Sequence, residues 1–524
     1  MRAKAIMVLG TASHVGKSLL TAALCRIIAQ QGYRVAPFKS QNMSLNSAAT
    51  FEGLEIGRAQ ALQAEAAGIA PSVDMNPILL KPAGDRSSQV VVRGKIWGKL
   101  TASDYHLRRV EELLPIVRGS YERLAAEHEV IVIEGAGSPA EINLKQHDIV
   151  NMRIAEMADA SCLLVGDIDR GGVFASLLGT FALLERHEQD RIQGFVINKF
   201  RGDLALLKPG IDMMEDRIGK PCVGVVPYLN DLVLDEEDSL GLPESNARES
   251  AAWLSLSDAD RQLRIAVVAL PSFSNFTDFD ALRSEPSVSL RFCRSSADIA
   301  HADVVILPGS KQTVDDLLWL RSEGFEQALL AYARIGLVVG ICGGMQMLGG
   351  QIADPDGIEC AVVVQGLGLL PIETTMRSLK VTSLSSGRLV SGSLFGLPVA
   401  VTSLSGYEIH VGETRYREGA KPFIELSRQA GSGRTQHHDG CVACDGRVFG
   451  TYLHGIFDDD AFRHAFIDAA RAFHRLAPVV VHEDWKRKRE DSLNRLSATV
   501  LESLDISRVF SWAGLAYQSE LQPH

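Results

Sequence analysis

The sequence has few cysteines, no excess of positive charge and no long apolar run that is free of turn-forming residues. Its eight cysteines among 524 residues follow no repeating spacing, which is typical of reduced thiols in a cytosolic protein and not of a disulfide framework. The formal net charge of −11 argues against a general binder of nucleic acid or anionic membranes, although it leaves room for a local phosphate pocket. We therefore expect a cytoplasmic protein with no nucleic-acid partner and no membrane partner.

Targeting and membrane-spanning signals are also lacking. Residues Met1–Gly10 predict a short strand leading into a loop, without the longer apolar core and cleavage site of a signal peptide. The uncharged run Ile335–Ala353 is long enough to cross a membrane, but it contains six glycines and two glutamines. We expect this run to be a strand, a turn and the start of a helix.

What is present is a repeated pattern of apolar strands and helices. At ~150 residues per domain the chain has room for two to four domains. The alternation predicts an α/β protein with two doubly wound sheets whose ligands lie outside the carboxyl ends of the strands. We predict domains at 1–234 and 263–478, a polar linker at 235–262 with room for a short helix at 251–256, and a helical C-terminal extension at 479–524. The basic run Lys486–Asp491 is expected on a solvated face of that extension.

The first strand leads into a candidate phosphate-binding loop. Gly10–Ser18 joins this strand to an apolar-periodic helix, the arrangement in which backbone N–H groups cradle phosphates. Lys17 is placed to reach the β- and γ-phosphates, and the Ser18 hydroxyl is placed to bind Mg²⁺. Thr11 stands where the usual pattern has its first glycine. The residues predicted to bind ATP are Gly10, Thr11, Ser13, Gly16, Lys17, Ser18 and Asn198, the last by reading an adenine edge unless it is only a turn former.

Two charged residues follow neighbouring strands on the same edge. Lys39 ends one strand and is predicted to contact a phosphate or a substrate carboxylate, the alternative being a solvated surface lysine. Glu134 ends the apolar run that starts at Val130, where a P-loop enzyme holds its magnesium. We predict Ser18 and Glu134 as the Mg²⁺ ligands, the alternative for Glu134 being a plain strand-end acid.

A second candidate site surrounds Cys342. The apolar run Leu337–Ile341 predicts a buried strand, and glycines on both sides of Cys342 allow the sharp turn that exposes a nucleophile. The alternative is a buried structural cysteine. The backbone N–H groups of Gly343 and of Gly309, in the turn after another strand, are predicted to form an oxyanion hole.

A thiol nucleophile needs a base, because only a few per cent of an ordinary cysteine is thiolate at neutral pH. His454 ends an apolar strand and is the predicted base, with His410 as the competitor. The segment His437–Cys444 resembles a metal cluster only superficially, since the chain has no second pair of cysteines to complete a tetrahedral site. We predict no metal there.

Longer motifs identify a family. The chain resembles the cobyric acid synthases, glutamine-hydrolysing amidoligases of cobalamin biosynthesis, over nearly its whole length. The matching segments are Phe38–Ser47, Ile56–Gly68, Ile133–Leu144, Asp167–Ala175, Ser274–Asp280 and Leu307–Thr313. The resemblance implies an N-terminal P-loop NTPase-like domain of the dethiobiotin-synthetase type, whose loop pattern accounts for Thr11. It also implies a C-terminal domain like the class I glutamine amidotransferases.

The resemblance further implies how the two domains work together. ATP, Mg²⁺ and L-glutamine as ammonia donor are expected to convert four carboxylates of the corrinoid adenosylcobyrinic acid a,c-diamide into amides. Cys342 and His454 carry over as nucleophile and base. Many class I amidotransferases have a glutamate where this chain has Ile456, so the residue that orients His454 must be missing or come from elsewhere, with Glu408 and Asp458 as guesses.

Three other readings remain. The sister enzyme that amidates only the a and c side chains shares the domain order, but the Gln41–Met43 loop and the 57–68 stretch favour cobyric acid synthase. A non-enzymatic switch ATPase would carry a lysine in place of Ala12 and would not need the Cys342 turn. A corrinoid-binding protein without catalysis would not need Lys17 and Ser18. The sequence leaves the oligomeric state open, a homodimer included.

Overall fold

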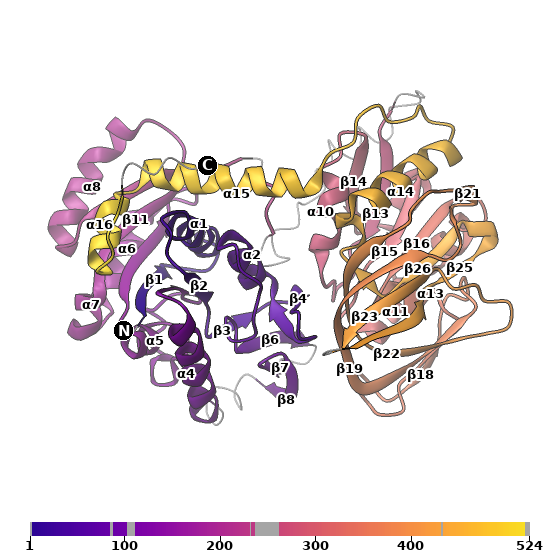
Figure 1. Ribbon diagram of the computed structural model, residues 1–524, viewed down its shortest axis with the longest axis horizontal. Helices are drawn as coiled ribbons and strands as arrows, with labels where there is room; N and C mark the ends of the chain where they lie inside the picture. Colours follow the sequence, from indigo (N-terminus) through magenta and orange to yellow (C-terminus); the bar gives the residue numbers. More distant parts are fainter. Residues whose placement is uncertain are drawn as a thin grey trace.

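Two α/β domains lie side by side, and one long helix near the C-terminus extends from the second back over the first (Figure 1). The computed structural model describes residues 3–83, 87–101, 110–230, 232–235, 261–430 and 433–518. The predicted helix at 251–256 and most of the predicted linker lie outside these ranges.

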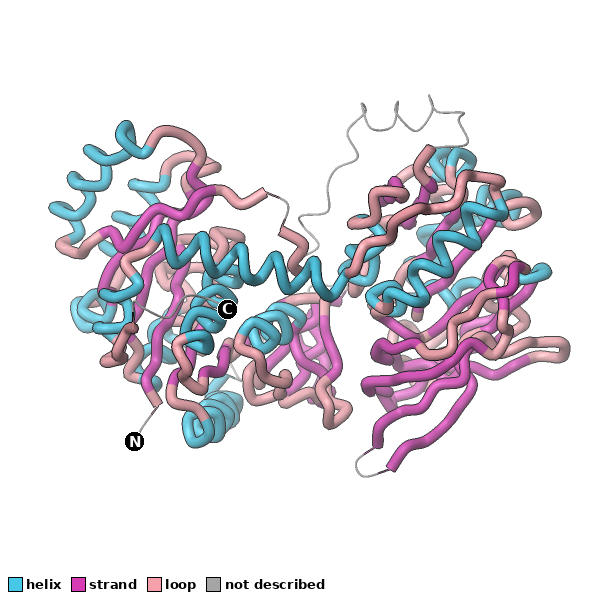
Figure 2. Tube along the Cα trace, turned by 45° about the horizontal axis from the view of Figure 1, so that its top comes forward, coloured by secondary structure: helices cyan, strands magenta, loops and turns pink. Residues whose placement is uncertain are grey.

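The N-terminal domain is built on a six-stranded parallel sheet in the order β12-β11-β10-β1-β9-β2. Alternate residues of β1 point to opposite faces, so that Ile6 and Val8 join one apolar core while Met7 and Leu9 join the other. Figure 2 shows helices on both faces of this sheet. The strands are β1 (Lys4–Gly10), β2 (Val35–Phe38), β9 (Val130–Glu134), β10 (Ser161–Asp167), β11 (Ile192–Phe200) and β12 (Cys222–Pro227). The helices are α1 (Lys17–Gln30), α2 (Arg58–Ala66), α4 (Val110–Glu127), α5 (Met152–Ala158), α6 (Val173–Ala182), α7 (Arg186–Arg191) and α8 (Leu204–Ile218).

A smaller set of strands between β2 and α4 faces the second domain (Figure 1). It was not predicted, because its strands are short and lack a clear alternation of apolar residues. The strands are β3 (Gln41–Met43), β6 (Ile78–Ala83), β7 (Ser87–Val92) and β8 (Lys95–Thr101) in one sheet, and β4 (Ser47–Ala49) with β5 (Glu55–Gly57) in a hairpin. The β4 strand contacts the second domain directly.

The C-terminal domain contains a six-stranded sheet in the order β14-β13-β15-β16-β26-β25, parallel except for its edge strand β25. This sheet confirms the second α/β pattern. Its strands are β13 (Leu263–Val268), β14 (Val288–Cys293), β15 (Val304–Leu307), β16 (Leu337–Ile341), β25 (Cys441–Ala443) and β26 (Val448–Thr451). Its helices are α10 (Asp280–Arg283), α11 (Thr313–Ser322), α12 (Phe325–Tyr332), α13 (Gly343–Leu348) and α14 (Asp460–Phe473).

A second, mostly antiparallel sheet packs beside it and was not predicted. It contains β17 (Gln351–Ala353), β18 (Val363–Gln365), β19 (Ile372–Leu389), β22 (Leu404–Tyr416), β23 (Ile424–Ala430), β24 (Gly433–Asp439) and β27 (Leu453–His454). The apolar run up to His454, expected to be one strand, is divided between the two sheets. It belongs to the first sheet as far as Thr451 and to the second from Leu453. His454 therefore lies where the chain crosses between them.

The C-terminal extension is helical and packs against the N-terminal domain. Helix α15 (Trp485–Ser503) buries Leu493, Leu496 and Val500, and α16 (Ile506–Trp512) buries Phe510, in one apolar core with residues of α1. The expectation for the basic run 486–491 is wrong at Arg489, whose side chain is only 13% exposed. Its guanidinium pairs with Asp235 at 2.9 Å and with Glu65 at 2.6 Å, and so anchors the helix to the first domain.

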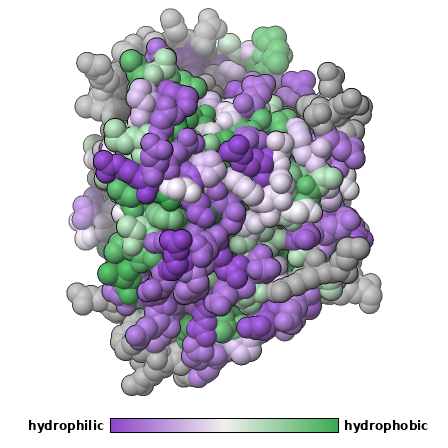
Figure 3. All heavy atoms as spheres, turned by 90° about the vertical axis from the view of Figure 1, so that its left-hand side faces the viewer, coloured by the Kyte–Doolittle hydropathy of each residue, from purple (hydrophilic) through white to green (hydrophobic). Residues whose placement is uncertain are grey.

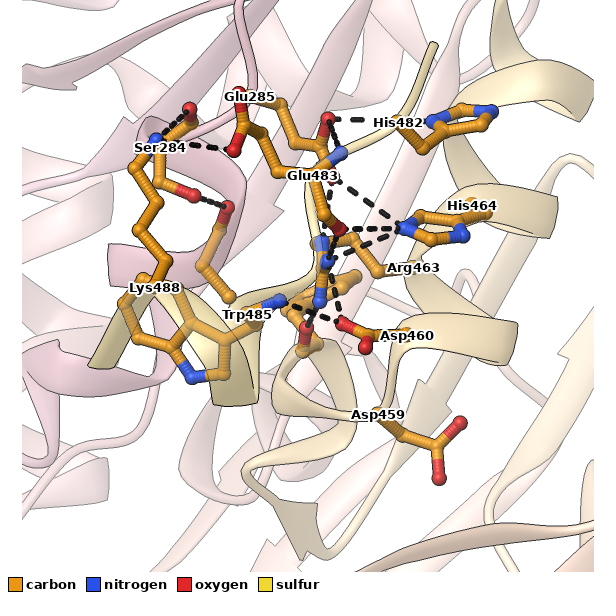
Figure 4. Close-up of polar contacts among 12 residues, drawn as sticks. Ser284, Glu285, Asp459, Asp460, Arg463, His464, His482, Glu483, Trp485 and Lys488 are labelled. Atoms are coloured by element: carbon orange, nitrogen blue, oxygen red, sulfur yellow. Dashed lines mark hydrogen bonds and ion pairs between the residues drawn. The ribbon is translucent and has the colours of Figure 1, made fainter. Parts of the chain in front are cut away.

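A buried polar cluster fixes the point where this extension leaves the second domain (Figure 4). The fully buried Arg463 donates to Glu285 at 2.7 Å and to the carbonyl of Glu483 at 2.6 Å. His464 and His482 stack beside it with ring centroids 4.2 Å apart. Glu285 and these two histidines lie close enough together to hold a metal ion. The carboxylate is already used by a guanidinium, so the contacts describe a hydrogen-bonded clasp.

A membrane span sets requirements on the helices and on the surface of a protein. None of the described helices combines the length and the apolar character needed to cross a bilayer. Figure 3 shows that the end of the N-terminal domain is mainly hydrophilic, with apolar side chains scattered between polar ones. Exposed apolar residues in this domain include Leu183, Leu204, Leu206 and Met213.

Candidate active sites

The Gly10–Ser18 loop lies at the carboxyl end of β1 and leads directly into α1. Gly16 adopts a left-handed conformation with φ of 97°, which glycine allows without strain. The Thr11 N–H donates to the Val165 carbonyl at 2.9 Å. The Lys17 ammonium folds back to the Ala12 carbonyl at 2.9 Å and the Gly137 carbonyl at 3.2 Å. The lysine therefore lies over the loop where phosphates are expected.

Glu134 is the centre of a buried polar cluster beside this loop. Its carboxylate, fully shielded from solvent, accepts from the Ser18 hydroxyl at 2.8 Å and the Lys39 ammonium at 3.0 Å. Lys39 is 3% exposed, so it is not the solvated surface lysine of the alternative. Gln63 of α2 also donates to Glu134 at 2.6 Å, and Gln60 lies 3.5 Å away. The two glutamines were missed, although they lie in the motif 56–68, because a motif does not show which strand its helix covers.

Asn198 also lies beside the loop. Its amide nitrogen donates to the Val15 carbonyl at 2.8 Å, so it braces the loop from β11, two strands away from β1 in the sheet. The adenine contact stays a prediction, and so do the roles of Gly10, Thr11 and Ser13 in binding ATP.

Cys342 occupies a strained turn between β16 and α13. Its φ of 51° and ψ of −110° are unusual for a residue with a side chain, and the turn aims the thiol away from the strand. Gly344 is required here, because a Cβ atom at this position would lie 2.0 Å from the Leu307 carbonyl oxygen. The thiol is buried, 3.7 Å from the Ile409 carbonyl.

His454 lies beside Cys342 and is held by Asp278. Asp278 accepts from His454 Nδ1 at 2.6 Å and from the Gly455 N–H at 3.0 Å, and Tyr407 lies 3.3 Å away through its hydroxyl. Burial lowers the pKa of His454, but Asp278 and Cys342, each through charge and hydrogen bonding, raise it to about 10. Cys342, His454 and Asp278 thus have the arrangement of a Cys–His–Asp triad, in which the imidazole can exchange a proton with the thiol.

The two guesses for the orienting acid are wrong. Glu408 accepts from Arg428 at 2.8 Å and from Ser385 at 2.7 Å, and Asp458 lies 4.0 Å from Arg58. The sequence does not reveal Asp278 as the orienting acid, although it lies in the motif 274–280, because it is far from His454 along the chain. His410, the competing base, stacks on Tyr452 at 3.7 Å, and burial lowers its pKa.

The turn after β15 lies against the nucleophile. A Cβ atom on Gly343 would meet the Ser310 backbone nitrogen at 2.9 Å, and one on Gly309 would meet His454 Cε1 at 3.2 Å. The turn that contains Gly309 therefore packs against both Gly343 and His454, and the oxyanion hole stays a prediction.

Comparison with known proteins identifies the family. Residues 6–241 match the CobQ/CobB/MinD/ParA nucleotide-binding domain, and residues 264–462 match the CobB/CobQ-like glutamine amidotransferase domain. The chain is 48% identical over 515 residues to a cobyric acid synthase of Moorella thermoacetica, covering 98% of both chains. The chain belongs to the cobyric acid synthase family. A relative of the same name from Sorangium cellulosum is 50% identical over 517 residues, covering 96% of this chain and 98% of its own. The two matched domains imply the use of ATP and glutamine.

In this cobyric acid synthase fold the two domains meet through the loops that carry their sites. The Ser47 N–H donates to Asn275 Oδ1 at 3.3 Å, and the Phe276 N–H donates to Asn46 Oδ1 at 3.2 Å. The second loop also contains Asp278. The motifs 38–47 and 274–280 are therefore partners across the domain interface.

Helix α2 also reaches both sites. Gln63 contacts Glu134, while the Arg58 guanidinium lies 5.3 Å from the ring centre of Tyr407. Tyr407 in turn contacts Asp278. One nine-residue helix thus joins the phosphate-loop cluster to the residues around the triad.

Proposed function

We propose that this protein uses ATP and glutamine to amidate the b, d, e and g carboxylates of adenosylcobyrinic acid a,c-diamide, giving adenosylcobyric acid. The observation that carries the proposal is the similarity along nearly the full chain to relatives named cobyric acid synthase. The sister reaction at the a and c carboxylates is the second candidate, because it needs the same two kinds of site. The names of the relatives favour the first.

The N-terminal site activates the carboxylate. A carboxylate is a poor acyl donor, and transfer of the ATP γ-phosphoryl group to it creates an acyl phosphate that ammonia can attack. Lys17 and the loop N–H groups neutralise charge on the phosphates, and Lys39 contacts a phosphate or the substrate carboxylate. Asn198 holds the loop and reads the adenine edge.

The residues beside the loop suit Mg²⁺. The Ser18 hydroxyl and the Glu134 carboxylate are oxygen donors, which this cation prefers, and Glu134 already attracts one cation in Lys39 at 3.0 Å. When bound by Ser18 and Glu134, Mg²⁺ supplies positive charge to the transferring phosphoryl group.

The C-terminal site releases ammonia from glutamine. The Cys342 thiolate attacks the carboxamide carbon, and the N–H groups of Gly343 and Gly309 stabilise the oxyanion. His454, oriented by Asp278, gives a proton to the leaving nitrogen. A thioester forms as ammonia leaves, and water then hydrolyses the thioester to glutamate.

Ammonia must then reach the acyl phosphate without being protonated. The pocket at Cys342 is lined by residues of both domains, including Lys81 of the first and Met376 of the second. This shared lining supports a sheltered passage across the domain interface.

The test separates the two sites. The Cys342→Ala protein is expected to lose amidation with glutamine and to keep it with ammonium salts, because its ATP site is intact. The Lys17→Met protein is the matched comparison, and it is expected to lose amidation with glutamine and amidation with ammonium salts. If Cys342→Ala also lost the ammonium-dependent reaction, separate sites of this kind would be the wrong description.

A further inference from the structure

The pocket beside the candidate nucleophile contains an unusual group of three lysines, of which one is buried and two are partly buried. Lys81, Lys311 and Lys380 line it together with Cys342 and His454. They come from β6, the turn before α11 and β19, so the group spans both domains. Burying ammonium groups is costly unless carboxylates compensate them.

Two of the three lysines are compensated. Glu55 is 1% exposed, accepts from Lys81 at 2.7 Å and pairs with Lys380 across the domain interface. Glu55 also accepts from the Ser47 hydroxyl at 2.7 Å. One carboxylate thus serves two ammonium groups.

Lys311 is the third, and no ion pair compensates it among the residues that the structure describes. Glu359, which lines the same pocket, instead accepts from the Val314 N–H at 2.9 Å. Burial, together with Lys81 and Lys380, lowers the pKa of Lys311 to about 7. The pocket therefore has a local excess of positive charge close to the thiol.

We infer that Lys311 binds the α-carboxylate of the glutamine whose side-chain amide reaches Cys342. The assignment rests on the proposed glutaminase and deepens it. Glutamine carries its carboxylate at the opposite end from the amide, and Lys311 lines the same pocket as the thiol, two residues after Gly309 of the predicted oxyanion hole. A bound carboxylate also supplies the missing compensation, which keeps Lys311 protonated.

Residues of both domains contribute to the proposed glutamine site. Glu55 of the ATP-binding domain pairs with Lys81 of the same domain and with Lys380 of the glutaminase domain, and both lysines line the pocket. The glutamine site is therefore complete only while the two domains are docked.

The experiment compares two amides in the full-length protein. L-Glutamine and 4-aminobutanamide share the amide and the amine, but the second lacks the α-carboxylate. For Lys311→Met we expect kcat/KM for glutamine to fall about 100-fold, mainly through KM, as when one charge-assisted hydrogen bond to a substrate is lost. Hydrolysis of 4-aminobutanamide should change less than about threefold, so discrimination between the amides collapses.

Controls separate recognition from folding. Methionine removes a partly buried ammonium that has no ion-pair partner and keeps a chain of similar length, so Lys311→Met is expected to fold and to keep ammonium-dependent amidation. Lys311→Arg should regain part of the preference for glutamine. Lys421→Met, at an exposed lysine of the same domain, should behave like the wild type.

Each contrary outcome is distinct. An unchanged preference for glutamine in Lys311→Met would overturn the assignment, and so would an equal loss with both amides. A raised KM for the corrinoid, with normal glutamine hydrolysis, would assign Lys311 to a corrinoid carboxylate instead. If the wild-type protein hydrolysed neither amide, the proposed glutaminase itself would be wrong, and this assignment with it.

Discussion

The Asp278→Asn substitution examines the least expected member of the triad. Besides the Tyr407 hydroxyl, Asp278 accepts from two N–H donors, His454 Nδ1 at 2.6 Å and the Gly455 N–H at 3.0 Å. Asparagine has nearly the same shape but only one acceptor oxygen. One of the two donors must therefore lose its partner, or the imidazole must place its proton on the nitrogen that faces Cys342.

The expected loss follows from these contacts. A hydrogen bond to a charged group contributes about 1.5–3 kcal/mol, which corresponds to roughly 10- to 150-fold in rate. A wrong tautomer raises the loss further, toward the ~10⁴-fold effect of the equivalent change in a serine protease. We therefore expect kcat/KM for glutamine hydrolysis to fall by about 10² to 10⁴, with ammonium-dependent amidation unchanged.

The pH dependence gives an independent readout. Asp278 helps to raise the pKa of His454 to about 10, above the ordinary value of 6.5. The high-pH limb of glutamine hydrolysis should therefore move to lower pH in the variant. Because the pKa of His454 is raised in the folded state, His454 adds stability that is fully present below pH 6.5 and is lost as pH rises through about 10. The free energy of unfolding of the variant should therefore change less over this pH range than that of the wild type.

The assay is glutamate release measured across this pH range. Asp458→Asn is the matched control, because Asp458 is a nearby, partly buried acid that lies 4.0 Å from Arg58 and does not contact His454. This control substitution is expected to lower kcat/KM for glutamine hydrolysis by less than about tenfold. An Asp278→Asn protein with normal kcat/KM and an unmoved pH profile would refute the triad.

Three further substitutions probe the phosphate site, the elbow and the extension. Lys39→Met leaves the buried Glu134 without its cation, so the free energy of unfolding in urea should fall by about 3 kcal/mol and ammonium-dependent amidation should be lost. Wild-type stability would contradict a role for the buried ion pair. Gly344→Ala pushes the elbow away from the Leu307 carbonyl, so glutamine hydrolysis should fall about 100-fold while ammonium-dependent amidation persists, and full glutaminase activity would speak against the packed turn. Leu496→Ala should lower the free energy of unfolding by about 2–5 kcal/mol in chemical denaturation, because this side chain is buried against the first domain. A loss below about 1 kcal/mol would show that the C-terminal extension contributes little to the stability of that domain.

The features that could be predicted from the sequence are those formed by residues close together along the chain. The phosphate loop and the Cys342 turn each need a strand, small residues and a helix in succession, and such local patterns are visible in one chain. The parallel sheets could be expected because their strands are apolar throughout and are separated by helices.

What it did not predict depends on contacts between distant residues. Asp278 and His454 meet only because two loops converge at the end of a sheet, and no spacing rule relates them. Arg489 looked solvated because a run of charges usually is, but Asp235 and Glu65 lie on another domain and bury it. The antiparallel sheet was missed because its strands are half-exposed and carry mixed residues.

The most direct measurement is mass spectrometry of adenosylcobyrinic acid a,c-diamide incubated with this protein, Mg-ATP and glutamine. Each conversion of a carboxylic acid into a primary amide replaces OH by NH₂ and lowers the mass by about one unit. We predict a ladder of four such steps that is absent without ATP and, for Cys342→Ala, appears only with ammonium. If this substrate stayed unchanged while cobyrinic acid gained two amides, the proposed substrate would be wrong and the sister reaction correct.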